Sequence, residues 1–195
     1  MEKIEINLIG AGGHAKVINA ILIDLGHSLN QVYDDHSFNF KGIQTIQTKP
    51  EGLESVVIAI GENKARKKLS SYQNQYVSIV HPSVLLDKSV VIGNGSMLIH
   101  GSIIQTDVTI GEHVIINTNA TIDHDCVLEN YVHIAPNATL CGNVSVGEGT
   151  LIGASATVLP GVKIGKWCVV GAGSVVNKNL PDFSNVAGVP AKKIK

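Results

Sequence analysis

Residues 84–179 read VLLDKS-VVIGNG-SMLIHG-SIIQTD-VTIGEH-VIINTN-ATIDHD-CVLENY-VHIAPN-ATLCGN-VSVGEG-TLIGAS-ATVLPG-VKIGKW-CVVGAG-SVVNKN, which is sixteen hexads without a break. The third residue of every hexad is aliphatic, the first is small or β-branched, and the fourth is glycine in six hexads. A period of six fits neither an amphipathic helix nor a simple strand, but it fits a short strand followed by a turn. The stretch therefore predicts a parallel β-helix in which three hexads close one coil, with roughly five coils in all.

The hexad positions also predict which side chains point inward. The aliphatic third residue is expected in the core of a triangular prism, and the fourth-position glycines are expected in tight turns that need a positive φ. Several outward second positions are nonetheless apolar, and they are Val91, Met97, Ile103, Ile115 and Val127. Faces of this kind are too apolar to be left in water, so a further surface is expected to cover them.

Composition excludes several functional classes. Lys and Arg number 15 against 16 Asp and Glu, a balance that gives no signal for nucleic-acid binding. No apolar run approaches the roughly 20 residues that span a bilayer, and no secretory signal is visible, so the cytoplasm is the expected compartment. The three cysteines, Cys126, Cys141 and Cys168, are expected to be packing residues rather than a disulfide framework. The basic cluster over residues 64–68 is interpreted as the solvated face of a helix.

Residues 1–80 have a different texture, in which strand and helix patterns alternate. Strands are expected at 4–9, 29–33, 55–60 and 76–80, and helices at 16–25 and about 62–72. This alternation predicts a small parallel α/β unit. His81-Pro82 marks the joint, because a residue that precedes proline is pushed out of helical conformation. The predicted domains are an α/β nucleotide-binding unit over 1–80, the β-helix over 81–180 and a tail over 181–195.

The first predicted strand ends in Gly10-Ala11-Gly12-Gly13-His14, and the second ends in Asp34-Asp35. This arrangement formally matches a dinucleotide fingerprint, but a unit of this size lacks the second mononucleotide-binding half. A glycine turn ahead of a helix allows backbone N–H groups to approach a phosphate. We therefore predict a nucleotide diphosphate rather than NAD at this loop, with a purely structural turn as the alternative.

The combination of these motifs over the whole chain resembles one family. The motifs are the Gly-x-Gly-Gly-His loop, the Asp34-Asp35 strand end, the Ala-Ile-Gly-x-Asn strand end at 59–63, His81-Pro82, the hexads and the Gly-Val-Pro-Ala-Lys segment at 188–192. They are similar to those of the bacterial hexapeptide-repeat sugar acetyltransferases, in particular the UDP-4-amino-sugar (UDP-N-acetylbacillosamine) N-acetyltransferases and their sialic-acid O-acetyltransferase branch. The resemblance implies a left-handed β-helix, a homotrimer with active sites between subunits, acetyl-CoA as donor and a UDP-linked amino-deoxy sugar as acceptor.

The resemblance also carries residue roles. His124 matches the family's general base, and Asp125 stands where the amino-sugar enzymes have a glutamate. The acetyl-CoA site is expected to include Asn117, His133 and Gly142, with Lys192 near the coenzyme tail. The sugar-nucleotide site is expected to include Gly10, Gly12, Gly13, His14, Asp34, Asp35 and Gly61.

The residue types suit this chemistry. An amine that attacks a thioester must lose a proton, and histidine, with a reference pKa near 6.5, can accept it at neutral pH. Gly142 lies 18 residues after His124, so its backbone N–H is expected one coil away in the same turn column, where it could stabilise an oxyanion.

Alternatives remain open: O-acetylation of a sialic acid or related sugar, a metal-dependent hydratase on the same solenoid, or a non-enzymatic scaffold. His113, His124 and His133 occupy different hexad places, which argues against a shared zinc site, and no metal is expected.

Overall fold

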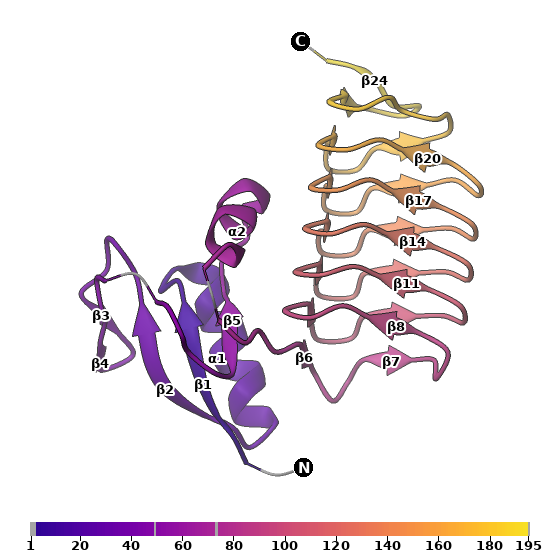
Figure 1. Cartoon of the computed structure of the whole chain (residues 1–195). Coiled ribbons are helices and arrows are strands. Elements are labelled where there is room, and N and C mark those ends of the chain that lie inside the picture. The colour runs from indigo at the N-terminus through magenta and orange to yellow at the C-terminus, as the bar shows by residue number, and fades with distance from the viewer. Residues whose placement is uncertain (1–2, 49, 73, 195) are drawn as a thin grey trace.

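The computed structural model describes residues 3–48, 50–72 and 74–194, so Lys195 of the predicted tail and Met1 of the predicted first domain lie outside the described residues. An α/β module lies beside a tall solenoid whose coils stack from the N-terminal to the C-terminal end (Figure 1). The solenoid is the predicted parallel β-helix, and the α/β module precedes it in the chain.

The core of the α/β module is a three-stranded parallel sheet in the order β2-β1-β5. Its strands are β1 (Glu5–Ile9), β2 (Ser28–Tyr33) and β5 (Val56–Ile58). Its helices are α1 (Gly13–Asp24) and α2 (Asn63–Ser70), and a small hairpin is made by β3 (Asn39–Phe40) and β4 (Ile43–Gln44). In α1, Ile18, Ile21 and Leu22 are buried because their spacing places them on one helical face. Within the described ranges, no helix is long and apolar enough to span a bilayer.

The expected fourth strand of this sheet, residues 76–80, is wrong as a single element. Tyr76 makes only an isolated bridge to Val56, whereas Ile79–Val80 form β6, which pairs with the solenoid strand β9 (Met97–Leu98). The solenoid therefore begins before the first predicted hexad. The physical reason is that the backbone of β9 offers a free edge that the arriving chain completes.

The solenoid strands form three parallel faces. The first face contains β7 (Leu85–Leu86), β10 (Ile103–Ile104), β13 (Thr121–Ile122), β16 (Thr139–Leu140), β19 (Thr157–Val158) and β22 (Val175–Val176). The second face contains β8 (Val91–Ile92), β11 (Thr109–Ile110), β14 (Val127–Leu128), β17 (Ser145–Val146) and β20 (Lys163–Ile164). The third face contains β6, β9, β12 (Ile115–Ile116), β15 (His133–Ile134), β18 (Leu151–Ile152), β21 (Val169–Val170), β23 (Asn185–Ala187) and the antiparallel β24 (Lys192–Lys193).

The predicted inward positions form the solenoid core. Third-position residues such as Ile104, Ile122 and Leu140 are at most 1% exposed, and the first-position residues Cys126 and Cys168 are buried beside them. Residues 18 positions apart pair in register, for example Ile103 with Thr121. With β6 before the hexads and β23 after them, the solenoid has about six coils rather than five.

The role assigned to the fourth-position glycines is wrong in one respect. The positive φ angles fall at the sixth position of the hexad, where Asp107, Asn119 and Asp125 adopt values of 59°, 56° and 59°. The fourth-position glycines are needed instead for close stacking of the coils. A Cβ on Gly93 would lie 2.5 Å from the carbonyl carbon of Gly111, one coil away.

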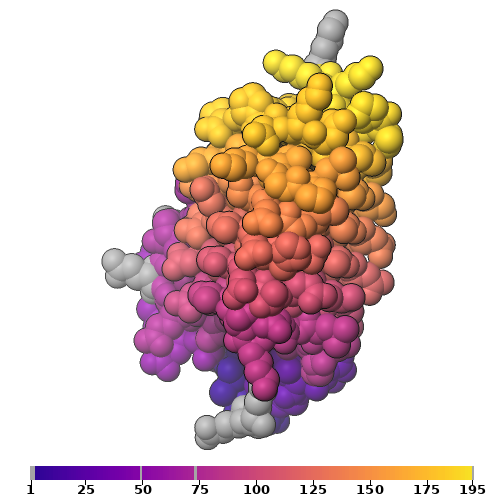
Figure 2. Space-filling view, turned by 90° about the vertical axis from the view of Figure 1, so that its right-hand side faces the viewer, coloured from indigo at the N-terminus to yellow at the C-terminus, as the bar shows by residue number. Residues whose placement is uncertain are grey.

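The α/β module covers part of the third face. Met97 and Ile115, which the hexad pattern places on the outside of the prism, are fully buried in a cluster with residues of the module such as Ile18 and Phe40. On the second face, Val91 and Val127 remain 62% and 44% exposed. The further surface expected over the apolar outward positions is therefore supplied by the chain itself at Met97 and Ile115, but not at Val91 and Val127. The coils at the C-terminal end, yellow in Figure 2, rise beyond the module.

Candidate active site

His124 and Asp125 lie in the turn between β13 and β14, at the edge where the first face meets the second. The imidazole Nδ1 of His124 is 2.7 Å from Asp125 Oδ2, and both side chains are about half exposed, at 49% and 52%. A carboxylate can only accept a hydrogen bond, so Nδ1 donates and Nε2 keeps its lone pair free. The adjacent carboxylate thus fixes the tautomer that leaves Nε2 available as a base.

The electrostatic surroundings favour the protonated form of His124. The hydrogen bond that His124 donates to Asp125, and then the charge of Asp123, raise the pKa of His124 above its usual 6.5. Asp123 Oδ1 also accepts a hydrogen bond of 2.8 Å from the His124 backbone N–H. The 2.7 Å contact also shows that the Asp125 side chain, although shorter than the glutamate of the amino-sugar enzymes, reaches the imidazole directly.

Gly142 lies next to the His124 ring, in the turn column that the spacing predicts. A Cβ on Gly142 would lie 2.5 Å from both Cε1 and Nε2 of His124, so only glycine leaves room for the ring in this position. In the described part of the chain, no acceptor is bonded to the Gly142 backbone N–H. That N–H is thus free to donate to a ligand held beside the imidazole.

His133 lies on the third face, on β15, in a quite different environment. Its Nε2 is 3.2 Å from Asn117 Nδ2, and its Nδ1 is 3.3 Å from the carbonyl oxygen of Gly61. The carbonyl can only accept, so Nδ1 donates to it and Nε2 accepts from the amide of Asn117. Burial, then the charges of Arg66 and His14, lower the pKa of His133 to about 4. Its Nε2 is already engaged, so within this chain His133 is not a free base.

A single chain does not bring His124 together with Asn117 and His133. Asn117 follows β12, at the edge between the third and first faces, whereas His124 lies at the edge between the first and second faces. His133 is on the third face, opposite the His124 edge. Of the predicted acetyl-CoA residues, Gly142 lies beside His124 in the same chain, whereas Asn117 and His133 could meet a His124 ring only across an interface between chains.

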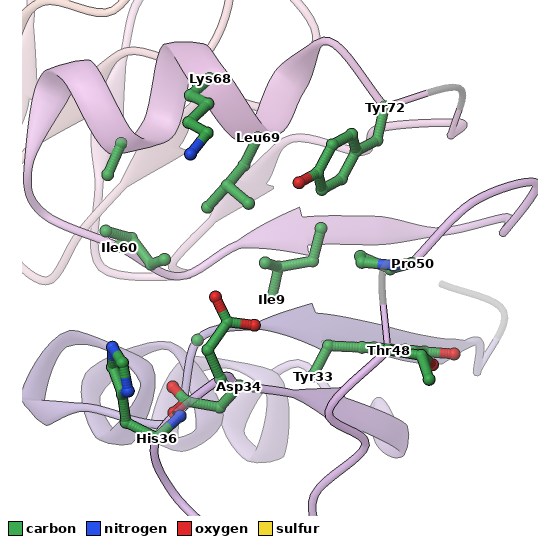
Figure 3. A pocket seen from close by; sticks show the side chains of 13 residues that line it. Ile9, Tyr33, Asp34, His36, Thr48, Pro50, Ile60, Lys68, Leu69 and Tyr72 are labelled. Carbon is green, nitrogen blue, oxygen red and sulfur yellow. The ribbon is translucent and has the colours of Figure 1, made fainter.

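Gly10 of the glycine loop and the acidic pair line a cavity at the carboxyl ends of β1, β2 and β5, whereas Gly12, Gly13 and His14 are not among its lining residues. Figure 3 shows Lys68 and Tyr72 on the α2 side, with Asp34 and His36 opposite them. The cavity is lined by Ile9, Gly10, Tyr33, Asp34, Asp35, His36, Thr48, Pro50, Ile60, Ala65, Lys68, Leu69 and Tyr72. Apolar walls with a few polar groups are typical of a small-molecule site.

The two aspartates of the predicted pair differ in their contacts. Asp34 accepts hydrogen bonds from the backbone N–H groups of Ala11 at 2.7 Å, His36 at 2.9 Å and Ser37 at 2.7 Å. Burial would raise the pKa of Asp34, but these three donors together lower it. Asp34 therefore holds the glycine loop to the end of β2, while Asp35 is exposed at the cavity.

The glycines of the loop also differ in what they do. Gly10 has a φ of 107°, and a Cβ there would lie 2.8 Å from the Ile60 side chain, so the fold itself requires glycine. A Cβ on Gly12 or Gly13 would meet no atom of the chain within 4 Å, which leaves open space before α1. The N-terminus of α1 has no side-chain cap. Open space in front of uncapped backbone N–H groups is suited to an anion.

His14, in the first turn of α1, faces inward. Its Nε2 is buried and has no hydrogen-bond partner among the described residues. Burial, then the charge of Arg66, lower the pKa of His14 to about 4. His14, Arg66 and His133 interact electrostatically, so the structure does bring His14 close to the predicted acetyl-CoA residue on β15.

The interpretation of residues 64–68 as a solvated helix face is wrong for Arg66. Arg66 is fully buried, and its guanidinium donates to the carbonyls of Gly61, His113 and Tyr131, among others, at 3.1, 2.8 and 2.8 Å. It therefore joins the end of β5 to the turns of the solenoid. Sequence reasoning also missed Lys68 and Tyr72 of the cavity. For Arg66, the signal available in the sequence was its spacing of three residues from Asn63, which places both on one face of the predicted helix.

A second hollow lies between the start of α2 and the upper part of the third face. It is lined by Gly61, Glu62, Asn63, Lys64, His133, Gly149, Leu151, Trp167, Cys168, Val169, Phe183 and Asn185. Gly61 and His133 are the predicted site residues that it brings together. Lys192 lies in β24, which pairs with β23, the strand that contributes Asn185 to this hollow. His113 is buried and packs against the rings of Tyr76 and Tyr131.

Comparisons with known proteins match both parts of the chain. Residues 5–72 match the PglD N-terminal domain. Residues 89–124, 107–142, 125–159 and 143–178 match the bacterial transferase hexapeptide family of six repeats. PerB from Caulobacter crescentus, solved in complex with CoA and GDP-perosamine, is 37% identical with a TM-score of 0.92, and the likeness covers 98% of this chain and 97% of PerB.

The chain belongs to the PglD-type hexapeptide-repeat sugar N-acetyltransferases.

Two further relatives agree with this membership. The acetyltransferase domain of PglB from Neisseria gonorrhoeae, solved with acetyl coenzyme A, is 31% identical with a TM-score of 0.89, and the likeness covers 99% of this chain and 100% of that domain. UDP-N-acetylbacillosamine N-acetyltransferase from Bacillus subtilis is 39% identical over 108 residues, which are 48% of this chain. The match spans 50% of the length of that curated relative. PglD-type sugar N-acetyltransferases are acetyl-CoA-dependent, which is the donor that the sequence predicts.

Proposed function

We propose that this enzyme transfers the acetyl group of acetyl-CoA to the 4-amino group of a UDP-linked amino-deoxy sugar, with His124 as the general base. The observation that carries the proposal is the His124–Asp125 pair, whose tautomer leaves Nε2 free beside Gly142. The relatives supply the reaction class, since the chain is similar to N-acetyltransferases that bind CoA or acetyl-CoA and, in PerB, a nucleotide-linked sugar. The cytoplasmic location expected from the sequence belongs to the same proposal.

The reaction follows from these groups. The sugar amine attacks the thioester carbonyl carbon, a C–N bond forms, and His124 Nε2 accepts the proton that the amine loses. The Gly142 N–H donates to the oxyanion of the tetrahedral intermediate. When that intermediate collapses, the C–S bond breaks and the imidazolium returns the proton to the departing thiolate of CoA. Asp125 holds the imidazole throughout and stabilises its protonated form.

The acceptor nucleotide is assigned to the α/β module. The cavity lined by Tyr33, Asp35 and Tyr72 suits the base and ribose, and the open N-terminus of α1 at Gly12 and Gly13 suits the diphosphate. His14 and Gly61 would then lie along the path from the diphosphate to β15. Acetyl-CoA is assigned to the solenoid, with Asn117 and His133 at the reacting end and Lys192 toward the coenzyme tail.

A homotrimer completes this arrangement. His124 and the Asn117–His133 pair lie on different sides of one prism, so an active site that contains both needs residues from two chains. The exposed apolar residues Val91 and Val127 on the second face favour packing against another prism. A stable monomer in light scattering would contradict this part of the proposal.

The substrate assignment is tested by measuring release of the CoA thiol from acetyl-CoA with UDP-linked 4-amino sugars, GDP-linked 4-amino sugars and free sialic acid as acceptors. We expect kcat/KM to be highest for a UDP-linked amine. A GDP-linked amine as the best acceptor would correct the nucleotide, following the similarity to PerB. Sialic acid as the best acceptor would replace N-acetylation with O-acetylation.

A variant of the glycine loop distinguishes the acceptor site from the donor site. Gly12→Val fills space that no atom of the chain occupies, so the fold should survive while the diphosphate is blocked. The KM for the nucleotide sugar should rise, and the KM for acetyl-CoA should change little. Equal changes in both KM values would show that this loop does not bind the diphosphate.

A further inference from the structure

A cluster of metal-ligating side chains lies where the α/β module meets the first coil of the solenoid. Asp24 is the last residue of α1, His81 directly follows β6, and His100 lies in the turn stacked on it one coil later. The Nε2 atoms of His81 and His100 are 3.1 and 3.9 Å from Asp24 Oδ2. One ligand atom from each residue lies within 4.8 Å of the other two, and among the described residues this is the one group of three with that property.

The spacing of these atoms fits a tetrahedral metal ion. Zinc bonds to imidazole nitrogen and carboxylate oxygen of about 2.0–2.2 Å place neighbouring ligand atoms roughly 3.3–3.5 Å apart. The two measured separations, 3.1 and 3.9 Å, lie on either side of that range. Two imidazoles and one carboxylate suit zinc and similar divalent transition metals, whereas calcium and magnesium prefer oxygen ligands alone.

The surroundings of His81 support a ligand role. The Ser83 backbone N–H donates to His81 Nδ1 at 3.1 Å, so the ring proton is on Nε2, where it is shared with Asp24. A metal ion at Nε2 would move that proton to Nδ1, which ends the hydrogen bond from the Ser83 N–H and makes Ser83 Oγ, 2.6 Å from Nδ1, the acceptor of the ring proton. An outer partner of this kind commonly orients histidine ligands.

His100 is also suited to binding. Its side chain is 38% exposed and that of Asp24 is 51% exposed, so an ion can reach the cluster from solvent.

We propose that Asp24, His81 and His100 bind one divalent transition-metal ion of the zinc class, which ties the α/β module to the solenoid. Asp24 comes from the module, and both histidines come from the solenoid, so a bound ion links the two parts directly. The site does not include His124, and none of its three residues lines the cavity or the second hollow. It is also distinct from the set of His113, His124 and His133, which the sequence argues against as a zinc site.

The test is calorimetric titration of ZnCl2 into the full-length chain after removal of any affinity tag and dialysis against a chelator. We expect one zinc ion per chain and a Tm that rises with zinc concentration, because an ion that binds only the folded state stabilises it. His100→Gln and Asp24→Asn should each weaken zinc affinity by at least about tenfold, since loss of even an outer-shell partner costs that much. MgCl2 should give no binding heat at this site.

The matched control is His27→Gln, which removes a histidine outside the cluster and should bind zinc as the wild type does. Circular dichroism and light scattering check that each variant keeps its fold and assembly. The proposal is overturned if the wild type binds no zinc, or if His100→Gln and Asp24→Asn bind it as tightly as His27→Gln.

Discussion

At the scale of single residues, the proposed chemistry depends on two neighbours in sequence. His124 Nδ1 bonds to Asp125 over 2.7 Å, and the missing side chain of Gly142 leaves space for the ring. His133 differs because burial holds its pKa at about 4 and Asn117 already occupies its Nε2. These two histidines therefore differ in chemical character because their surroundings differ, and of the two it is His124 that has a free basic nitrogen.

Replacement of the base should slow the reaction without abolishing binding. In His124→Ala we expect kcat to fall by about 10²–10⁴-fold, the usual contribution of a positioned base. The KM values for both substrates should change little, because the base acts mainly in the transition state. Steady-state kinetics of the variant measure this, with His27→Ala as a control at an unrelated position. A correctly assembled His124→Ala enzyme that keeps more than roughly a third of wild-type kcat would show that another group is the base.

Asp125 should control the pH at which the base becomes active. Because its hydrogen bond raises the pKa of His124 above 6.5, kcat in the wild type should rise with pH through a midpoint above that value. In Asp125→Asn the main cause of the shift is lost, so this acid limb should move to lower pH while the plateau rate decreases. The kcat–pH profiles of the wild type and of Asp125→Asn measure this shift of the acid limb. An unmoved limb would mean that Asp125 does not set the ionisation of the base.

At the scale of the elements, two positions of the hexad favour glycine for different physical reasons. Sixth-position residues adopt positive φ, which Asn119, Asn137 and Asn143 tolerate as well as glycine. Fourth-position glycines are needed for coil stacking, because a Cβ on Gly147 would lie 2.6 Å from the Gly165 carbonyl carbon. The two positions should therefore respond differently to substitution.

Gly147→Ala should destabilise the solenoid by about 1–3 kcal/mol, the usual cost of overpacking a closely packed interior. Gly173→Asn should change stability by less than about 0.5 kcal/mol, because a Cβ at Gly173 meets no atom within 4 Å and asparagine accepts its φ of 67°. Chemical denaturation of both variants gives the comparison. A greater loss for Gly173→Asn would reverse the roles assigned to the two positions.

At the scale of the whole molecule, Arg66 links the α/β module to the solenoid. Its guanidinium is fully buried and bonds to carbonyl oxygens of both parts, including Gly61 on one side and His113 and Tyr131 on the other. Burial lowers the pKa of Arg66 to about 10, so it stays charged at neutral pH. It therefore fixes the end of β5, and with it Gly61, against His133.

Arg66→Met should loosen this junction. Several buried carbonyls would lose their donors, which should lower the free energy of unfolding by about 3 kcal/mol or more. Hydrogen exchange should accelerate in β5, α2 and the turns around 113 and 131, and change little in the first and second faces. Lys64→Met, an exposed change in the same helix, should have an effect below about 0.5 kcal/mol. Uniform acceleration across the solenoid would show that Arg66 supports the whole fold rather than the junction.

The sequence by itself determined the solenoid and its core. A hexad is a local pattern of six residues, and three hexads make one coil of 18 residues. The inward positions and the adjacent His124 and Asp125 are therefore visible without coordinates. The glycine loop and Asp34 were also visible as motifs. Their sharing of one cavity follows from the parallel order of β1, β2 and β5.

Only the tertiary structure decided how the two parts meet. The burial of Met97, Ile115 and Arg66, the contributions of Lys68 and Tyr72 to the cavity and the Asp24–His81–His100 cluster all join segments with no common period. A repeat specifies its own stacking because each coil packs on a copy of itself. The docking of an unlike module depends on the shape and charge of two different surfaces, which no spacing in the sequence encodes.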